Sequence, residues 1–375
     1  MVDMKLRIYI VLLCLCGCLV CASYPYPYGY DYEITYPYRY SLYTLNQGDG
    51  TMSVIPLKVN ESFSELKDYL IEPLTSVAVG NDPVAIAFKY GTNNPDLYPD
   101  IALILNRGGK DIACFDPDNM KVTGRIPLPS DADPIGMTIN KGIVYVADRA
   151  KKRLFISNTF NQCSDISFDS VGLSITPAAI ASGENTIYVI DESGQSVLPA
   201  WGEYVSTFPL SWGFTVTDIV YAGHKYREHY LYGYGGYIPE GTYVLSASPR
   251  YIYYLTGDSL TSTSIGDSLT TETSGGIPER IFISPDGNYL FVTFQGSGNI
   301  WGYGLSGGLA FSDVVGTVAF LPSSNMVFIS RPSHNSIIAH TLRGNVADKT
   351  INIGASPGEI AVVFSPAIAP NRKAY

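Results

Sequence analysis

Charged residues are scarce in this chain. Only 15% of its 375 residues are Asp, Glu, Lys or Arg, against about 25% in an average soluble protein. The 34 acidic residues outnumber the 24 basic ones, which gives a net charge of -10. Nucleic-acid binding needs a basic face that neutralises phosphates, so this balance argues against a nucleic-acid partner.

Histidine and the common motifs of metal and cofactor sites are scarce as well. Only 4 His are present, which argues against a His-rich copper or haem protein. Beyond residue 22 the sequence has no HExxH, paired CxxC or CxxCH motif and no phosphate-binding loop. The sequence therefore predicts no cofactor and no metal site, and it identifies no catalytic residue.

Long hydrophobic runs are limited to the N-terminus. Lys5 and Arg7 precede an apolar run, Ile8–Val20, which is shorter than the roughly 20 residues of a membrane span. A basic segment, an apolar segment and small residues at its end are typical of a secretory signal. We expect residues 1–22 to be a signal peptide with cleavage before Ser23.

A lipoprotein signal is the alternative interpretation of the same segment. Leu15-Cys16-Gly17-Cys18 is similar to a bacterial lipobox, with Cys18 as the lipidated residue. Both interpretations predict export to the cell surface, the extracellular space or the periplasm. Under either interpretation, the only membrane attachment that the sequence predicts is a lipid anchor on Cys18.

Cysteine is rare in the body of the chain. Four of the 6 cysteines lie in the N-terminal segment, and only Cys114 and Cys163 lie beyond it. An exported chain would allow these two to form a disulfide, but the sequence gives no geometry. We expect two buried thiols, and the bridge stays open as the alternative.

The rest of the chain repeats one hairpin pattern, an apolar strand, a polar or Gly-containing turn and a second apolar strand. Alternating β-branched and aromatic residues around a turn indicate half-buried antiparallel strands. The seven copies begin at Tyr40, Ile101, Ile143, Thr186, Tyr251, Tyr289 and Met326.

A further short apolar strand precedes most hairpins, usually after a proline. Its seven markers are Pro83, Pro134, Pro177, Thr217, Pro278, Val318 and Pro357, at spacings of 51, 43, 40, 61, 40 and 39 residues. A period near 40 residues with several strands per unit is typical of a β-propeller. A β-solenoid is the weaker alternative, because its repeats are shorter and carry no hairpin.

The two ends of the repeat region complement each other. The last marker strand, Ser356–Phe364, has no hairpin after it, and the first hairpin, Tyr40–Leu57, has no marker strand before it. The sequence therefore predicts an all-β, seven-bladed β-propeller over residues 40–364, closed by the C-terminal strand against the N-terminal strands. We expect one short helix at Ser62–Glu72, which begins with a capping-box pattern, and a tail at residues 365–375.

The segment Ser284–Thr293, SPDGNYLFVT, resembles the repeat core of the YVTN-type seven-bladed propellers, and Gly142–Asp148 and Asn185–Asp191 are weaker copies. The resemblance covers roughly residues 40–364 and implies the propeller fold. Members of this family include cell-surface and S-layer proteins, lactonase-like proteins and large subunits of periplasmic amine dehydrogenases. The fold alone does not choose among these functions.

Tyrosine is concentrated in two segments. Nine of the 29 Tyr lie between Tyr24 and Tyr43 and ten between Tyr221 and Tyr254. We expect residues 23–39 to form a Tyr/Pro-rich arm and residues 224–247 to form an insertion on the same face of the propeller. The candidate binding residues are Tyr28, Tyr30, Tyr32, Tyr230, Tyr232, Tyr234 and Tyr237.

Two functions compete. The favoured one is an exported, non-enzymatic binding or scaffold protein whose Tyr-rich face takes a protein partner, a glycan or a neighbouring subunit, with possible self-association. The alternative is a periplasmic enzyme or enzyme subunit, such as a lactonase-like hydrolase or the large subunit of a redox complex. The lining of the axial channel discriminates between them, because a cluster of His, Arg and carboxylates would favour the enzyme.

Overall fold

The computed structural model describes residues 38–62, 65–71, 74–90, 99–223, 238–256, 259–262, 276–284, 287–303, 309–311, 314–321, 326–342 and 348–364. The chain divides into Met1–Thr35, which lies outside these ranges, and Tyr36–Tyr375, which contains every described strand. No helix within the described ranges is long and apolar enough to cross a membrane.

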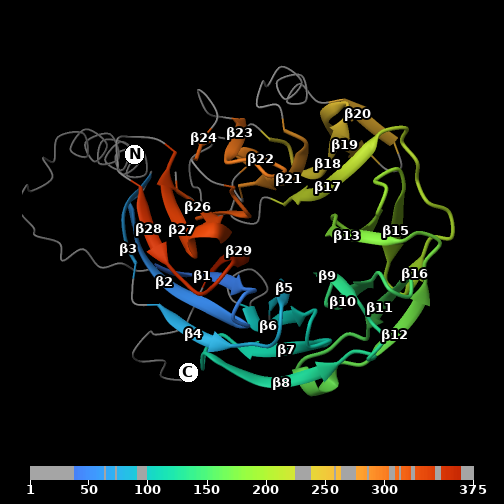
Figure 1. The fold of residues 1–375 in the computed structure, drawn as a ribbon, viewed down its shortest axis with the longest axis horizontal. Helices are drawn as coiled ribbons and strands as arrows, with labels where there is room; N and C mark the ends of the chain where they lie inside the picture. Colours follow the sequence, from blue (N-terminus) through green and yellow to red (C-terminus); the bar gives the residue numbers. More distant parts are fainter. Residues whose placement is uncertain are drawn as a thin grey trace, which may run out of the picture. The chain divides into compact units, whose positions relative to one another are not determined.

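The described strands form seven antiparallel sheets, which we call blades 1 to 7 and which surround a common axis (Figure 1). Blade 1 consists of β29 (Pro357–Phe364), β1 (Tyr38–Asn46), β2 (Thr51–Ser62) and β3 (Glu65–Ile71), with β4 (Thr75–Ala78) also paired to β2. Blade 2 consists of β5 (Pro83–Tyr90), β6 (Pro99–Asn106), β7 (Asp111–Asp116) and β8 (Lys121–Pro127). Blade 3 consists of β9 (Pro134–Asn140), β10 (Ile143–Asp148), β11 (Arg153–Ser157) and β12 (Phe168–Gly172).

The other four blades follow the same order along the chain. Blade 4 consists of β13 (Pro177–Ser182), β14 (Ile187–Asp191), β15 (Val197–Trp201) and β16 (Tyr204–Val205), and blade 5 of β17 (Thr215–Ala222), β18 (Gly241–Ser248), β19 (Arg250–Thr256) and β20 (Ser259–Ser262). Blade 6 consists of β21 (Pro278–Ile283), β22 (Leu290–Phe294), β23 (Asn299–Tyr303) and β24 (Leu309–Ala310), and blade 7 of β25 (Val318–Phe320), β26 (Met326–Arg331), β27 (Ser336–Thr341) and β28 (Lys349–Asn352). In the described part of the chain, the short 3-10 helices η1 (Cys163–Asp165) and η3 (Pro332–His334) lie in connections between strands.

The core is divided among the interfaces between blades. The described residues form seven clusters of buried apolar side chains, and each cluster joins two neighbouring blades. On β6, Leu103 and Leu105 pack towards blade 3, whereas Ala102 and Ile104 pack towards blade 1. Since successive strand residues point to opposite faces, every middle strand serves two interfaces. Seven interfaces for seven blades make a closed ring.

Ring closure is achieved as the sequence predicts. The C-terminal strand β29 pairs with β1, with Tyr40 opposite Phe364 and Thr44 opposite Ile360. It becomes the innermost strand of blade 1. The all-β, seven-bladed fold and its closure by the C-terminal strand are therefore confirmed.

The expected helix at Ser62–Glu72 is wrong. Glu65–Ile71 forms β3, which pairs with β2 from Leu57 opposite Ile71 to Ser62 opposite Glu65. The capping-box pattern is a local signal, and the unpaired N–H and C=O groups along the outer edge of β2 offer more hydrogen bonds than a single helical turn.

Blade 5 also differs from expectation. The hairpin expected to begin at Tyr251 is built from the third and fourth strands, β19 and β20, whereas the second strand is β18 (Gly241–Ser248). The end of the expected insertion at 224–247 is therefore sheet. The reason is burial, because Tyr243, Val244 and Leu245 are almost completely inaccessible to solvent. Residues 224–237 lie outside the described residues.

The expectation of two free thiols is wrong. Cys114 on β7 and Cys163 at the start of η1 form a disulfide, with their Cα atoms 6.1 Å apart. Cys114 is fully buried. The bridge links blade 2 to the connection that follows β11 of blade 3.

Replacing Cys163 with Ser is expected to lower the free energy of unfolding by about 2–4 kcal/mol, because the disulfide closes a 49-residue loop and so restricts the unfolded chain. Urea denaturation of the variant and the parent protein measures this difference. The control is the parent under reducing conditions, which should fall to the stability of the variant. Equal midpoints for the variant and the oxidised parent would contradict the prediction.

Candidate active site in the axial channel

One position recurs on the innermost strands of the blades. In six blades a bulge interrupts the pairing of the innermost strand with its neighbour near its start, and bulges of this kind re-aim the following side chain. The residues that follow the bulge are Ala85, Gly136, Ala179, Asp218, Arg280 and Glu359. Thr317, which precedes β25, is the corresponding residue of blade 7.

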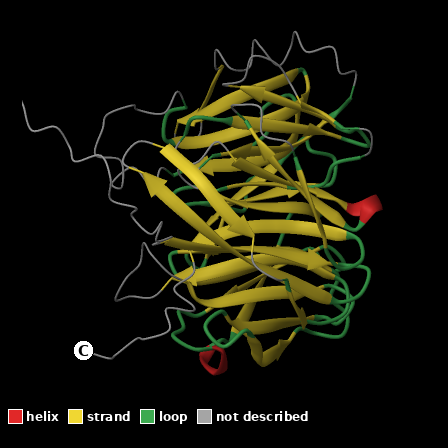
Figure 2. Ribbon diagram, turned by 90° about the vertical axis from the view of Figure 1, so that its left-hand side faces the viewer, coloured by secondary structure: helices red, strands yellow, loops and turns green. Residues whose placement is uncertain are grey.

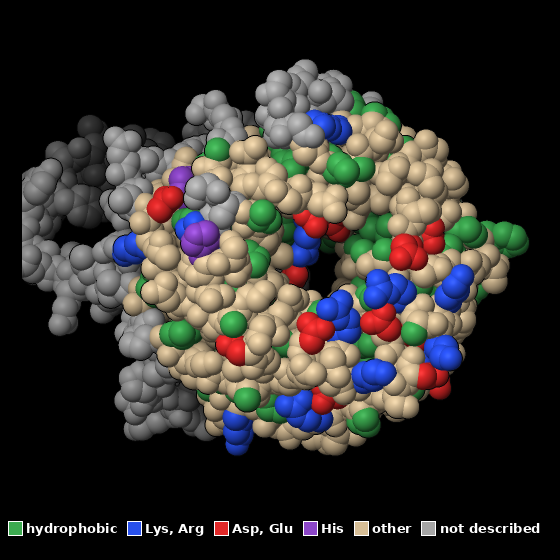
Figure 3. Space-filling model, viewed as in Figure 1, with side chains coloured by type: hydrophobic (Ala, Val, Ile, Leu, Met, Phe, Trp, Pro, Cys, Tyr) green, Lys and Arg blue, Asp and Glu red, His purple; other side chains and the backbone are tan. Residues whose placement is uncertain are grey.

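The ring formed by this position is divided into two arcs. Blades 2 to 4 carry only Ala or Gly, whereas blades 5, 6, 7 and 1 carry Asp, Arg, Thr and Glu. Figure 3 shows a hollow at the centre of the ring with acidic and basic side chains beside it. The polar groups therefore gather on one side of the channel, opposite small side chains.

Arg280 on β21 forms an ion pair with Glu359 on β29, with Arg280 Nη1 2.9 Å from Glu359 Oε2. The pair spans blade 7, where Thr317 Oγ1 donates a hydrogen bond of 2.7 Å to the carbonyl of Gly358. The two side chains are 38% and 29% exposed, so channel water reaches both. Burial opposes the charge of Arg280, but Glu359 and Asp218 more than offset this and raise its pKa. Arg280 therefore stays a cation, and apart from the Nη1 bond to Glu359 its N–H donors have no hydrogen-bond partner among the described residues.

Asp218 on β17 accepts two backbone hydrogen bonds. Its Oδ2 accepts from the N–H of Ile281, next to Arg280, at 3.0 Å, and its Oδ1 accepts from the N–H of Ile219 at 2.9 Å. Surrounding blades enclose the carboxyl group, although the residue stays half-buried. Burial raises the pKa of Asp218 to about 6, although the Arg280 charge and the two N–H groups lower it. An Asp with this pKa exchanges protons near neutral pH.

The raised pKa of Asp218 predicts a pH-dependent contribution to stability. In the unfolded chain the pKa of Asp is about 3.9, so the folded protein holds the proton more tightly. This contribution is complete below pH ~4 and is lost as the pH rises through about 6. Relative to the Asp218→Asn variant, the parent should lose unfolding free energy between pH ~4 and pH ~7. Urea denaturation across that range measures the difference, and a constant difference would contradict the assignment.

None of the candidate site residues predicted from the sequence falls within the described part of the chain. Tyr28, Tyr30, Tyr32, Tyr230, Tyr232, Tyr234, Tyr237 and Cys18 lie outside the described residues. Of the histidines, His334 lies in η3 and His340 on β27, where its Nδ1 is 2.7 Å from Asp348 Oδ1, so neither is on an innermost strand. Among the described residues no group of three or more His, Cys, Asp or Glu is arranged to hold a metal ion.

None of the channel residues is among those predicted from the sequence, although the repeat carries a signal for them. The seven marker strands include TDIVYA, IPERIFI and SPGEIAVVF. Aligning them with the uncharged copies places Asp218, Arg280 and Glu359 at one position, which is charged in three blades.

The comparisons with known proteins support the fold. No family model and no curated protein matches this chain. Among solved structures, it is similar to a periplasmic gluconolactonase from Pseudomonas aeruginosa, with a TM-score of 0.61, 12% identity and coverage of 88% of this chain and 100% of that one. Two proteins assigned as 6-phosphogluconolactonases are also similar. For that of Bacteroides uniformis the TM-score is 0.59, with 12% identity over 87% of this chain and 99% of that one. For the protein of Bacteroides fragilis the TM-score is 0.60, with 10% identity and coverage of 88% of this chain and 99% of that one.

These identities establish the propeller fold alone, and membership of the YVTN repeat family is not confirmed. The preference for a non-enzymatic binding protein is corrected, because the similar structures carry lactonase names and the channel carries an Arg with two carboxylates. The physical reason for the error is that tyrosine content reports on surfaces, whereas the charged groups of the channel come from three residues that lie far apart in the sequence.

Proposed function

We propose that the chain is a lactonase-like hydrolase that opens a lactone ring in the axial channel, and that it is related to the YVTN-type propellers. The arrangement of Asp218, Arg280 and Glu359 on one arc of the channel carries this proposal. The gluconolactonase and 6-phosphogluconolactonase names of the similar structures favour it.

The three side chains have complementary roles in the proposed hydrolysis. Asp218, as a carboxylate, takes a proton from water while the water oxygen bonds to the lactone carbonyl carbon. Arg280 donates hydrogen bonds to the developing oxyanion, and Glu359 holds the guanidinium in place. When the bond to the ring oxygen breaks, the proton on Asp218 passes to that oxygen, which leaves a hydroxy acid.

The charge of the cluster favours an uncharged lactone. With Asp218 ionised, two carboxylates face one guanidinium, so the cluster repels a phosphorylated substrate. Glucono-1,5-lactone should therefore be a better substrate than its 6-phosphate.

Purified protein incubated with glucono-1,5-lactone is expected to release acid with saturation kinetics above the spontaneous rate, which a pH-stat measures. Arg280→Gln should lower kcat/KM by about 10²–10³-fold, as expected for the loss of a donor to an oxyanion, and Arg280→Lys should restore activity only in part. The matched control is Arg125→Gln on β8, the outermost strand of blade 2, which breaks an exposed ion pair with Asp111 (2.8 Å). The control variant should keep the activity of the parent. The proposal fails if no lactone is hydrolysed faster than in buffer, or if Arg280→Gln is as active as the control.

Export is also a proposal. We propose that the mature protein begins at Ser23, or at a lipidated Cys18, because a basic segment and the apolar run Ile8–Val20 stand at the N-terminus. The intact mass of native material distinguishes these forms, since acyl chains add mass to Cys18. Retention of Met1 would contradict both.

A further inference from the structure

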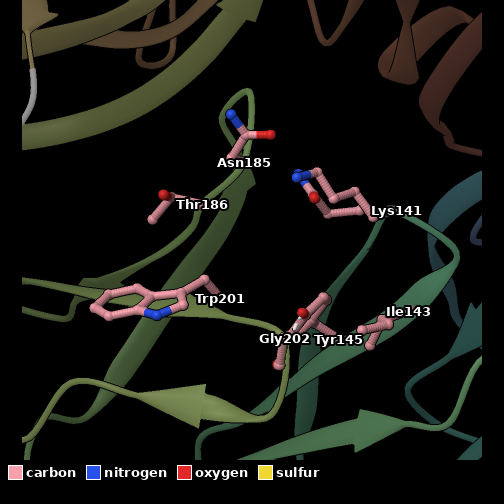
Figure 4. Close-up of a pocket in the computed structure, with 8 residues that line it drawn as sticks. Lys141, Ile143, Tyr145, Asn185, Thr186, Trp201 and Gly202 are labelled. Carbon is pink, nitrogen blue, oxygen red and sulfur yellow. Dashed lines mark hydrogen bonds between the residues drawn. The ribbon is translucent and has the colours of Figure 1, made fainter.

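A second site lies between blades 3 and 4, away from the charged arc of the channel. It is a pocket of about 420 Å³ (Figure 4). Its lining includes Lys141, Ile143 and Tyr145 from blade 3, and Asn185, Thr186 and Trp201 from blade 4.

An exposed indole forms one wall of this pocket. Trp201, at the end of β15, is 47% exposed and packs against Tyr204, which is 52% exposed, with ring centroids 4.7 Å apart. Exposed aromatic surface with polar residues around it commonly marks a binding site. Gly202 follows with a φ of 58°, and its carbonyl accepts a 2.9 Å hydrogen bond from the hydroxyl of buried Tyr145. Blade 3 therefore fixes the turn that carries Trp201.

The polar wall is also fixed in place. Lys141 adopts the left-handed conformation, with φ 49°, in the turn between β9 and β10. The side-chain amide of the preceding Asn140 donates to Ser182 Oγ at 3.0 Å and to the carbonyl of Gly183 at 3.1 Å. These bonds tie the turn of Lys141 to the turn of Asn185. Figure 4 shows Lys141 and Asn185 at one end of the pocket and Trp201 at the other end.

We propose that this pocket binds a single pyranose ring that carries a carboxylate, a uronic acid. The C–H face of a pyranose packs on an indole, while its hydroxyls pair with amide and hydroxyl groups such as those of Asn185 and Thr186. Lys141 supplies a cation for the carboxylate. An aliphatic ligand would leave these polar groups unpaired, and a quaternary ammonium would be repelled by Lys141.

The sugar is either a free monosaccharide or the terminal residue of an acidic glycan, and the test separates these sources. Full-length protein is titrated with glucuronate, with glucose and with an oligosaccharide ending in glucuronate, using ligand-observed NMR and calorimetry. Saturable binding of glucuronate, tighter than that of glucose, is expected. If the oligosaccharide binds more tightly than glucuronate, the ligand is the end of an acidic glycan. If the two bind equally, the ligand is the free monosaccharide.

Variants assign the binding to the pocket. Trp201→Ala should weaken glucuronate binding by at least about tenfold, whereas Phe208→Ala should leave it unchanged. Phe208 is the matched control because it is 79% exposed in the connection after β16 and does not line the pocket. Lys141→Gln should reduce the preference for glucuronate over glucose by about two- to fivefold, and thermal melting checks that each variant is folded.

The proposal is overturned if no sugar binds saturably, or if Trp201→Ala binds as tightly as the parent. Equal affinities for glucose and glucuronate in the parent would overturn the assignment of a uronic acid. These readouts measure binding in a pocket whose lining does not include Asp218, Arg280 or Glu359, so they hold whether or not the channel hydrolyses a lactone.

Discussion

Replacing Asp218 with Asn is expected to lower kcat/KM for lactone hydrolysis by about 10²–10⁴-fold, the usual contribution of a general base. Asn is nearly isosteric but cannot accept the proton of the attacking water. Because the pKa of Asp218 is about 6, kcat/KM of the parent should rise with pH through about 6 and then level off. Asp218→Asn should lose this rise, and pH-stat kinetics measures both effects.

Two controls separate chemistry from folding in this experiment. Asp218→Glu retains a carboxylate and should keep a pH-dependent rate, although the longer side chain disturbs the hydrogen bonds to Ile219 and Ile281. Thermal melting should show that Asp218→Asn is folded. An Asn variant with the parent's rate and pH profile would exclude Asp218 as the base.

Truncation after Asn352, which removes β29, is expected to abolish cooperative unfolding. β29 pairs along β1 and places Ile360 and Val363 in the clusters on either side of blade 1. Each such side chain contributes about 1.5–3 kcal/mol of burial, against a total stability of about 5–15 kcal/mol. The truncation also exposes β1 as a sheet edge, which promotes aggregation.

The matched control is a truncation after Phe364, which removes only residues 365–375. It leaves every described strand intact, and its melting should match that of the full chain. Circular dichroism and light scattering follow both truncations. A cooperative transition at the parent temperature after removal of β29 would contradict closure of the ring by this strand.

The sequence predicted the fold well because strand alternation and turn residues recur in every unit. Closure of the ring could be predicted because the first hairpin has no marker strand before it and the last marker strand has no hairpin after it. In blade 5, by contrast, three strands follow one another between Gly241 and Ser262 with short turns, and a pattern of two strands fits either pair. Only burial of Tyr243 and its neighbours identifies the second strand.

The candidate active site was hidden because its members are far apart in the chain. Arg280 and Glu359 are separated by 79 residues, and the residues that form the disulfide by 49. Local motifs detect neither pair. The repeat itself brings such positions together, because residues one or two blades apart occupy corresponding places around the axis.

The strand that closes the ring also carries Glu359. During synthesis from the N-terminus, Asp218 and Arg280 emerge long before this last part of the cluster. A nascent chain therefore lacks the partner of Arg280 until β29 docks beside β1, and the same step that seals the ring completes the charged cluster. Activity of this cluster would consequently act as an internal check that the whole chain has been made and folded.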